Sequence, residues 1–286
     1  MAQSSWRENW VLARDIKTRY IDAGEDGPTV VMLHGGGPGA SGSAGFRYLI
    51  PLMSDRFRIF APDQISYGET SAPTIAYPVL AHHSLVNHLR DWMDALCLTN
   101  VHLIGNSQGA YVAARYALDF PGRVSKLFMI GSGTIAQSYG LSTPDNEGRK
   151  ALREFDGTQA GMRRFLEAIV NDPSKVTDDL VESRTAKYNL PGILEMTQSF
   201  NEGRERIMDN SFWHEEFMLR GKLENLKIPS MMVWGKEDSF APVQLGYELE
   251  KLLPNIEFKY AENAGHQVQT DQPELIANMA SNFFLE

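Results

Sequence analysis

A serine flanked by glycines is the residue of this sequence best suited to nucleophilic chemistry. Ser107 lies in the run Gly-Asn-Ser-Gln-Gly of residues 105–109, between an apolar stretch, 101–104, and an alanine-rich one, 111–117. The first stretch favours a buried strand and the second a helix. A tight turn between them would hold the serine in strained backbone geometry, with glycines where neighbouring chain passes close by. The pattern predicts a nucleophile elbow, in which the Gln108 N–H at the helix start faces a developing oxyanion.

An acid and a histidine follow at two later strand ends. Asp238 comes after the apolar run 229–235, and His266 comes after the alternating run 256–260. Serine is a poor nucleophile at neutral pH, so His266 would take its proton, and Asp238 would hold the imidazole in the correct tautomer. Glu237 is the competing acid, and we prefer Asp238 because a Ser-Phe-Ala-Pro turn follows it. The order serine, acid, histidine is that of the α/β-hydrolases.

A glycine loop follows the first predicted strand of the sheet. The strand covers residues 28–34 and three glycines follow it at 35–37. Glycines leave backbone N–H groups free to point into a cavity at the carboxyl end of the strand, which we expect to form the second half of an oxyanion hole. No Gly-Lys-Ser/Thr and no helix-opening Gly-x-Gly-x-x-Gly follows, which disfavours nucleotide binding. The adjacent His34 is expected to pack beneath the loop.

The order of the predicted elements indicates the fold. A hairpin at 10–23 is expected at an exposed sheet edge. After it, apolar runs alternate with helical segments, which predicts a mostly parallel sheet with helices on both faces. The predicted strands are 28–34, 57–63, 101–104, 124–130, 229–235 and 256–260, and the clearest helix is 81–96. Residues 134–223 are rich in charge and helix formers. We therefore predict an α/β-hydrolase fold with a core of 1–133 and 224–286 and a helical lid, 134–223, inserted before the last strands; an independent helical domain is the alternative.

Composition limits the partners of the chain. Its 286 residues carry a net charge of −9, which argues against binding to nucleic acid or to an anionic membrane. The sequence contains no secretory-signal pattern and no long apolar run, so we expect no membrane span. Cys97 is the only cysteine, which excludes an intramolecular disulfide and favours the cytoplasm, and we expect its side chain to be buried. His82, His83 and His88 lack a carboxylate partner, and we expect neither metal nor cofactor.

Four motifs together resemble one known enzyme family. They are His-Gly-Gly-Gly-Pro-Gly-Ala at 34–40, the elbow at 105–109, Gly-Lys-Glu-Asp at 235–238 and Gly-His at 265–266. They look like those of the meta-cleavage-product hydrolases of bacterial aromatic degradation, and the similarity covers nearly the whole chain. The resemblance implies hydrolysis of a carbon–carbon bond in a 2-hydroxy-6-oxohexa-2,4-dienoate. It assigns the triad to Ser107, Asp238 and His266, and the oxyanion-hole N–H groups to Gly36 and Gln108, with Gly37 as a substitute for Gly36.

The resemblance also implies contacts to the substrate. Residues 177–184 are similar to the lid segment that carries the family's arginine for the substrate carboxylate, which assigns that role to Arg184. A guanidinium grips both oxygens of a carboxylate, so the expected partner is a small carboxylate-bearing molecule. Asn106, beside the nucleophile, would hydrogen-bond the same end of the substrate. The resemblance also implies a homodimer formed through a sheet edge.

Three positions depart from the family pattern. Gln267 follows the catalytic histidine where tryptophan is usual, Ser-Ala-Gly at 43–45 stands where asparagine is usual, and Ser66 replaces a glycine. The first two touch the dienoate subsite, where Gln267 is an expected substrate contact. They favour an alternative function, an esterase or lactonase with the same triad, whereas Arg184 and Asn106 favour carbon–carbon hydrolysis. A third interpretation is a ligand sensor with slow turnover.

Overall fold

The protein is built on one eight-stranded sheet. The computed structural model describes residues 6–71 and 80–286. The strand order is β1-β2-β4-β3-β5-β6-β7-β8. Strand β2 pairs antiparallel with β1 and β4, and the pairs from β4 through β3 to β8 are parallel, which confirms the predicted mostly parallel sheet. The strands are β1 (Arg7–Ala13), β2 (Ile16–Ala23), β3 (Thr29–Leu33), β4 (Arg58–Pro62), β5 (Val101–Asn106), β6 (Val124–Ile130), β7 (Ser230–Gly235) and β8 (Glu257–Ala261).

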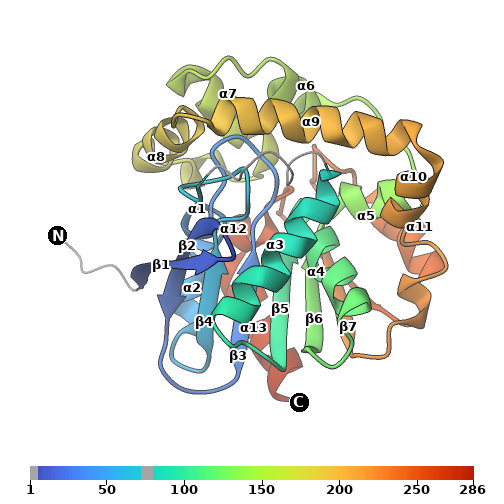
Figure 1. Ribbon diagram of the computed structural model, residues 1–286. Coiled ribbons are helices and arrows are strands. Elements are labelled where there is room, and N and C mark those ends of the chain that lie inside the picture. Colours follow the sequence, from blue (N-terminus) through green and yellow to red (C-terminus); the bar gives the residue numbers. More distant parts are fainter. Residues whose placement is uncertain (1–5, 72–79) are drawn as a thin grey trace.

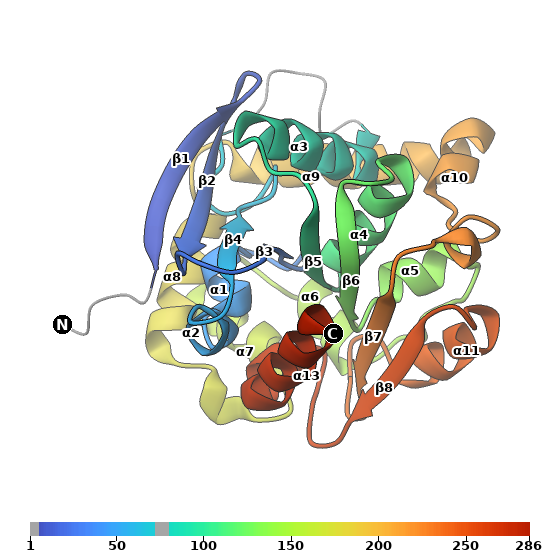
Figure 2. The same ribbon diagram turned by 90° about the horizontal axis from the view of Figure 1, so that it is seen from below.

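Helices pack on both faces of the sheet, as Figure 2 shows. Core residues of α3, α4 and α11 gather on one face, and those of α1, α2, α12 and α13 gather on the other. These helices are α1 (Gly42–Phe46), α2 (Leu49–Met53), α3 (His82–Ala95), α4 (Gln108–Asp119), α11 (Gln244–Leu252), α12 (Val268–Asp271) and α13 (Pro273–Leu285), with α5 (Gly133–Ser138) following β6. The α/β alternation expected from the sequence is therefore present.

The central strands are apolar on both faces because both faces are covered. In β7, Met232 and Trp234 belong to the core on one face, whereas Met231 and Val233 belong to the core on the other. Successive strand residues point to opposite faces, so a strand buried on both sides needs a continuous apolar run. This explains why the runs were recognisable in the sequence.

Cys97 is a correction to the sequence analysis. Its side chain is exposed instead of buried. Helix α3 ends at Ala95, and Cys97 then adopts a left-handed backbone conformation with φ of 53°. The chain turns away from the apolar face of the helix at this point, which carries the thiol into solvent. The apolar residues beside Cys97 in the sequence therefore led to a wrong prediction of burial.

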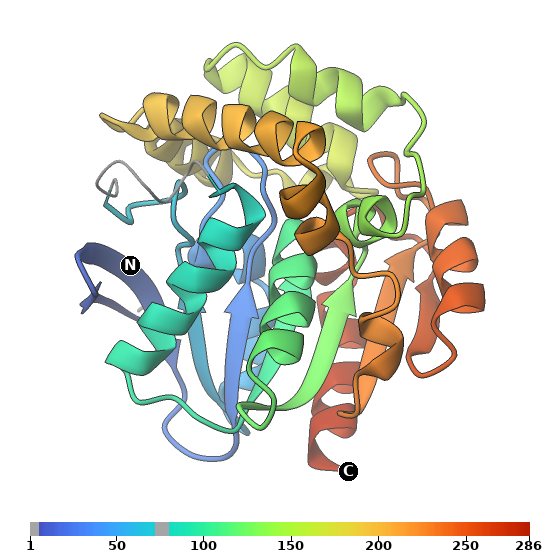
Figure 3. The same ribbon diagram turned by 45° about the vertical axis from the view of Figure 1, so that its right-hand side comes forward.

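Helices α6 to α9, which we term the cap helices, lie across the carboxyl ends of the parallel strands, as Figures 1 and 3 show. They are α6 (Glu147–Arg153), α7 (Gln159–Ile169), α8 (Asp178–Tyr188) and α9 (Ile193–Asp209), and α10 (Ser211–Phe217) returns the chain to the core. Helices α7 and α8 share a small apolar cluster of their own, separate from the two cores of the sheet. The cap helices thus form a roof over the sheet edge at which the motifs end.

None of the helices in the described ranges is long and apolar enough to cross a membrane. The first five residues, on which part of the signal-peptide expectation rests, lie outside those ranges.

Candidate active site

Ser107 occupies a tight turn between β5 and α4. Its φ of 56° and ψ of −118° lie in a region that side chains rarely adopt. Ser107 N–H donates to the Ile130 carbonyl of β6 at 2.8 Å, which fixes the turn to the sheet. The strained conformation persists because the surrounding structure determines it, a feature typical of functional sites. The structure therefore places Ser107 as a nucleophile elbow requires.

The glycines on either side of Ser107 are required by close packing. A Cβ atom on Gly105 would lie 2.4 Å from the Gly109 carbonyl oxygen, and one on Gly109 would lie 2.1 Å from the Leu33 carbonyl oxygen. Real Cβ atoms do not approach backbone atoms so closely, so strand β3 and helix α4 can meet only through glycine at these positions. This contact also brings the loop after β3 next to Ser107.

His266 and Asp238 form a buried hydrogen-bonded pair. The His266 Nδ1 lies 2.8 Å from Asp238 Oδ2, and both residues are 5% exposed. The other carboxylate oxygen, Oδ1, accepts from the backbone N–H groups of Phe240 and Ala241 at 2.8 and 2.7 Å. Asp238 is thereby held in place and can orient the imidazole with its Nε2 free for proton transfer. The competing acid Glu237 instead accepts from the Ala264 N–H.

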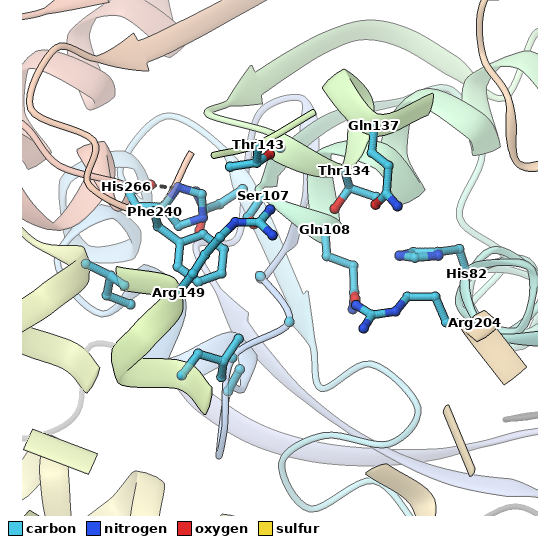
Figure 4. Close-up of a pocket in the computed structure, with 18 of the residues that line it drawn as sticks. His82, Ser107, Gln108, Thr134, Gln137, Thr143, Arg149, Arg204, Phe240 and His266 are labelled. Atoms are coloured by element: carbon cyan, nitrogen blue, oxygen red, sulfur yellow. Dashed lines mark hydrogen bonds between the residues drawn. The ribbon is translucent and has the colours of Figure 1, made fainter. Parts of the chain in front are cut away.

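Ser107 and His266 face one cavity of about 1000 Å³ beneath the cap helices. Figure 4 shows the two side chains at the same end of this cavity, with the ring of Phe240 beside the imidazole. Over the described part of the chain, no hydrogen bond joins Ser107 Oγ to His266 Nε2. Catalytic hydrogen bonds commonly tighten only once substrate is bound. The predicted nucleophile and base therefore face the same cavity without a direct hydrogen bond between them.

The predicted oxyanion-hole residues line the same cavity. Gln108 is the first residue of α4, so its N–H has no acceptor within the helix. The Gln108 side chain donates to the Tyr67 hydroxyl at 3.1 Å, and this hydroxyl donates to the Gly36 carbonyl at 3.3 Å. A Cβ on Gly36 would lie 2.7 Å from the Gln108 amide oxygen. The Gln108 side chain is therefore linked through Tyr67 to the glycine loop, whose N–H groups are the predicted second half of the oxyanion hole.

Asn106 has a positioning contact that the sequence did not indicate. Its Nδ2 donates to the carbonyl oxygens of Ile130 and His266, at 3.3 and 3.2 Å. Both donor hydrogens are thus used to hold the histidine loop against β6, which leaves Oδ1 for a ligand. Gln267 lines the cavity, and its Oε1 accepts from the Thr270 hydroxyl at 3.1 Å.

Arg184 is a buried cation with no anionic partner. It is 2% exposed and lines the cavity from α8. Its Nε and Nη2 donate to the Pro38 carbonyl at 3.0 and 2.6 Å, and its guanidinium lies 6.0 Å from the centroid of the Phe165 ring. Burial lowers its pKa to about 10. No carboxylate in the described ranges forms an ion pair with it. A buried charge is costly unless paired, so this position is suited to an anionic ligand.

Glycine at position 37 makes room for that arginine. A Cβ atom there would lie 3.0 Å from Arg184 Nη2 and 2.9 Å from the Phe165 ring. Gly37 also lines the cavity. The glycine loop therefore connects the oxyanion-hole residues to the cationic wall, which puts all predicted substrate contacts around one space.

Two further histidines, His34 and His88, pack into the fold. His34 is buried, its Nδ1–H donates to the Gly35 carbonyl at 2.8 Å, and its Nε2 accepts from the Gln64 N–H at 3.0 Å, so it supports the loop as expected. Burial lowers the pKa values of both His34 and His88 to about 4. Within residues 6–71 and 80–286, no three His, Cys, Asp or Glu side chains are grouped to hold a metal ion.

Asp271 and two arginines are parts of the site that sequence reasoning missed. Buried Asp271 accepts from the N–H groups of Asn171, Asp172 and Gly265 at 2.8 to 3.0 Å, and so ties the end of α7 to the histidine loop. Arg149 and Arg204 enter the cavity from α6 and α9. No local pattern marks these residues, because only the packing of the cap helices brings them to the site.

Sequence comparisons agree with this geometry. The family model for the alpha/beta hydrolase fold matches residues 28–273. A 2-hydroxy-6-oxononadienedioate/2-hydroxy-6-oxononatrienedioate hydrolase of Paraburkholderia xenovorans strain LB400 is 32% identical over 94% of this chain and 91% of its own. A 2-hydroxy-6-oxo-6-(2'-aminophenyl)hexa-2,4-dienoic acid hydrolase of Metapseudomonas resinovorans is 27% identical over 99% of this chain and 92% of its own.

Solved structures give the same picture. The meta-cleavage product hydrolase CumD from Pseudomonas fluorescens IP01 superposes with a TM-score of 0.81, at 27% identity over 96% of this chain and 97% of its own. The 2-hydroxy-6-oxo-6-phenylhexa-2,4-dienoate hydrolase from Rhodococcus strain RHA1 superposes with a TM-score of 0.84 over 98% of this chain and 99% of its own. At 23% identity, the second likeness concerns the fold alone.

Proposed function

Because this chain belongs to the meta-cleavage product hydrolase family of α/β-hydrolases, we propose that it cleaves a carbon–carbon bond in a 2-hydroxy-6-oxohexa-2,4-dienoate-type ring-fission product. Ser107 is the nucleophile, His266 the base and acid, and Asp238 the group that orients the base. We place the reaction in the cytoplasm, since a chain with one cysteine needs no oxidising compartment.

The observation that carries this proposal is the buried Arg184 in the same cavity as Ser107. An esterase acting on a neutral acyl group needs no such cation, and the chain keeps one at 2% exposure without an acidic partner. A carboxylate accepting from the guanidinium offsets the cost of burying it, and a bidentate pair also fixes the direction of the substrate. The dienoate carboxylate is therefore held at Arg184 and the 6-oxo carbon faces Ser107.

The reaction needs a proton shift before the bond can break. The dienol first becomes a ketone, with its hydroxyl proton removed and a proton delivered to C5, and His266 is the titratable group positioned to move it. Ser107 then attacks C6 as His266 accepts its proton, and the oxygen at C6 becomes an oxyanion that accepts from the Gly36 and Gln108 N–H groups.

Collapse of the oxyanion breaks the C5–C6 bond. The electron pair passes to C5 and is stabilised as the dienolate of the 2-oxo acid, which takes up a proton to give a 2-hydroxypentadienoate. Water, with its proton accepted by His266, then releases the second carboxylic acid from Ser107. One water molecule is consumed, and no oxidant or reductant is required.

The test is loss of the visible absorbance of a 2-hydroxy-6-oxohexadienoate on mixing with purified protein. The proposal expects bleaching that is abolished in Ser107→Ala, with equimolar pentadienoate and carboxylic acid formed. A nitrophenyl ester serves as the comparison substrate. Brisk ester turnover without bleaching would reject carbon–carbon hydrolysis in favour of an esterase with the same triad.

A further inference from the structure

Two arginines in the cavity have no role in the proposed chemistry. Arg149 on α6 is half-buried, and its Nε is buried without a hydrogen-bond partner. Its guanidinium lies 5.7 Å from the centroid of the Phe240 ring. Arg204 on α9 lines the same cavity with an exposed side chain. In the described parts of the chain, neither guanidinium forms an ion pair.

The two guanidinium groups extend towards each other across the cavity, as Figure 4 shows. The pKa of Arg149 is lowered, first by burial and then by the positive charge of Arg204, so the two like charges interact. Arg153 provides a contrast, because it lines the cavity but is paired with both Asp145 oxygens at 2.7 and 3.0 Å. Asp145 also attracts Arg149, but its carboxylate is bound to Arg153. The facing like charges of Arg149 and Arg204 repel each other, and an anion between them would remove that repulsion.

Two acidic side chains, Glu205 and Asp209, also line the cavity. Both are exposed residues of α9, and among the residues with coordinates neither forms an ion pair with Arg149 or Arg204. Neither carboxylate is therefore bound to the arginine pair.

The arginine pair is separate from Arg184. Arg149 stacks on Phe240, whose ring centroid lies 4.8 Å from that of His266. Arg184 instead stacks on Phe165 beside Gly37, and burial alone lowers its pKa, without a contribution from the other two arginines. The cavity thus has one cationic position at the glycine loop and a second on the histidine side.

Polar groups lie near the second position. His82 is 4% exposed, lines the cavity and has a buried Nδ1 without a hydrogen-bond partner. Figure 4 shows Arg204 beside it, with Thr134 and Gln137 on the neighbouring wall. An aromatic or alkyl substituent would leave these donors and charges without partners, which costs free energy.

We propose that Arg149 and Arg204 form a second anion subsite, so that the substituent on the 6-oxo carbon ends in a carboxylate. This inference rests on the proposed function for the placement of the dienoate at Arg184. The substrate is then a dicarboxylate held at both ends, with the scissile bond at Ser107 between them. The second carboxylate determines specificity and takes no part in bond cleavage.

Two substrates of equal length test the inference: a 2-hydroxy-6-oxonona-2,4-dienedioate and the analogue whose ketone-side chain ends in methyl. Binding of each to the inactive Ser107→Ala protein is measured by calorimetry, and turnover is measured with the parent. Both measurements are repeated in Arg149→Gln, Arg204→Gln and the double variant. Arg153→Gln is the matched control, because it removes a cavity-lining arginine that already has a carboxylate partner.

The expected result is that the dicarboxylate binds about tenfold to a hundredfold more tightly than the methyl analogue. That preference disappears in the double variant and persists in Arg153→Gln. The affinity for the methyl analogue is the same in all these variants as in the parent. Equal affinities, or a preference kept in the double variant, would overturn the inference even if both substrates are cleaved. Preferential binding without cleavage would support the subsite and reject the proposed function.

Discussion

Replacing Arg184 by glutamine separates a ligand-binding role from a structural one. Burial lowers the pKa of the Arg184 guanidinium from its ordinary value to about 10. One pKa unit corresponds to about 1.36 kcal/mol, so the free protein bears a cost of about 3 kcal/mol for this charge. The two hydrogen bonds to the Pro38 carbonyl offset that cost by about 1.5 to 3 kcal/mol. The substitution should therefore change the free energy of unfolding by less than about 2 kcal/mol.

Catalysis should respond far more strongly than stability. Loss of a bidentate pair between guanidinium and carboxylate is worth about 3 kcal/mol or more, which is a fall in kcat/KM of at least about a hundredfold. A substrate whose C1 carboxylate is replaced by the primary amide should lose little on the same substitution. The assays are steady-state bleaching of both substrates and urea unfolding of both proteins. Arg153→Gln, which removes an exposed arginine paired with Asp145, is the control for a general change of charge.

Either of two results would refute a carboxylate-binding role for Arg184. If Arg184→Gln lost several kcal/mol of stability while kcat/KM fell only a fewfold, the arginine would be a structural anchor of α8 to the glycine loop. An equal loss for acid and amide substrates would also refute carboxylate recognition.

Three further outcomes are expected. Asp238→Asn should keep substrate affinity but lower kcat by about 10³ to 10⁴, because the imidazole of His266 loses its orienting carboxylate; single-turnover kinetics check this, and a fall of less than tenfold would contradict the assignment. Ser66→Gly should raise the free energy of unfolding by about 1 kcal/mol, since Ser66 has a left-handed φ of 73° and a buried hydroxyl without a partner; an unchanged melting temperature would disprove the strain. His88 has a folded pKa lowered to about 4, so the unfolded chain binds the extra proton between about pH 6.5 and 4 and stability falls as pH falls. The loss of stability between pH 7 and 5 should be about 2 kcal/mol smaller in His88→Gln than in the parent, and an unchanged pH dependence in that variant would contradict it.

The sheet and the elbow could be predicted because their signals are local. A strand buried on both faces needs a continuous apolar run, and the turn at Ser107 needs glycine at 105 and 109. The three predicted triad positions lie at carboxyl ends of parallel strands, which share one edge of the sheet. The positions of Ser107, Asp238 and His266 after their strands were therefore enough to predict that they lie at the same edge of the sheet.

The contacts made by the cap helices could not be predicted in the same way. An amphipathic helix shows which face is buried, but not what that face meets. Arg149 and Arg204 were therefore indistinguishable from solvated arginines. The contacts of Asn106 could not be predicted for another reason. Its side-chain amide donates to backbone carbonyls that lie 24 and 160 residues away in the sequence, so the neighbouring nucleophile gives no indication of them.

The most direct test of the central claim is hydrolysis of the dienoate in ¹⁸O-labelled water, followed by mass spectrometry of both products. The account predicts that the acid formed from C6 gains one labelled oxygen, that the 2-hydroxypentadienoate gains none in its carboxylate, and that Ser107→Ala yields neither product. Absence of the labelled acid, or its formation at the parent rate by Ser107→Ala, would contradict serine-dependent carbon–carbon hydrolysis.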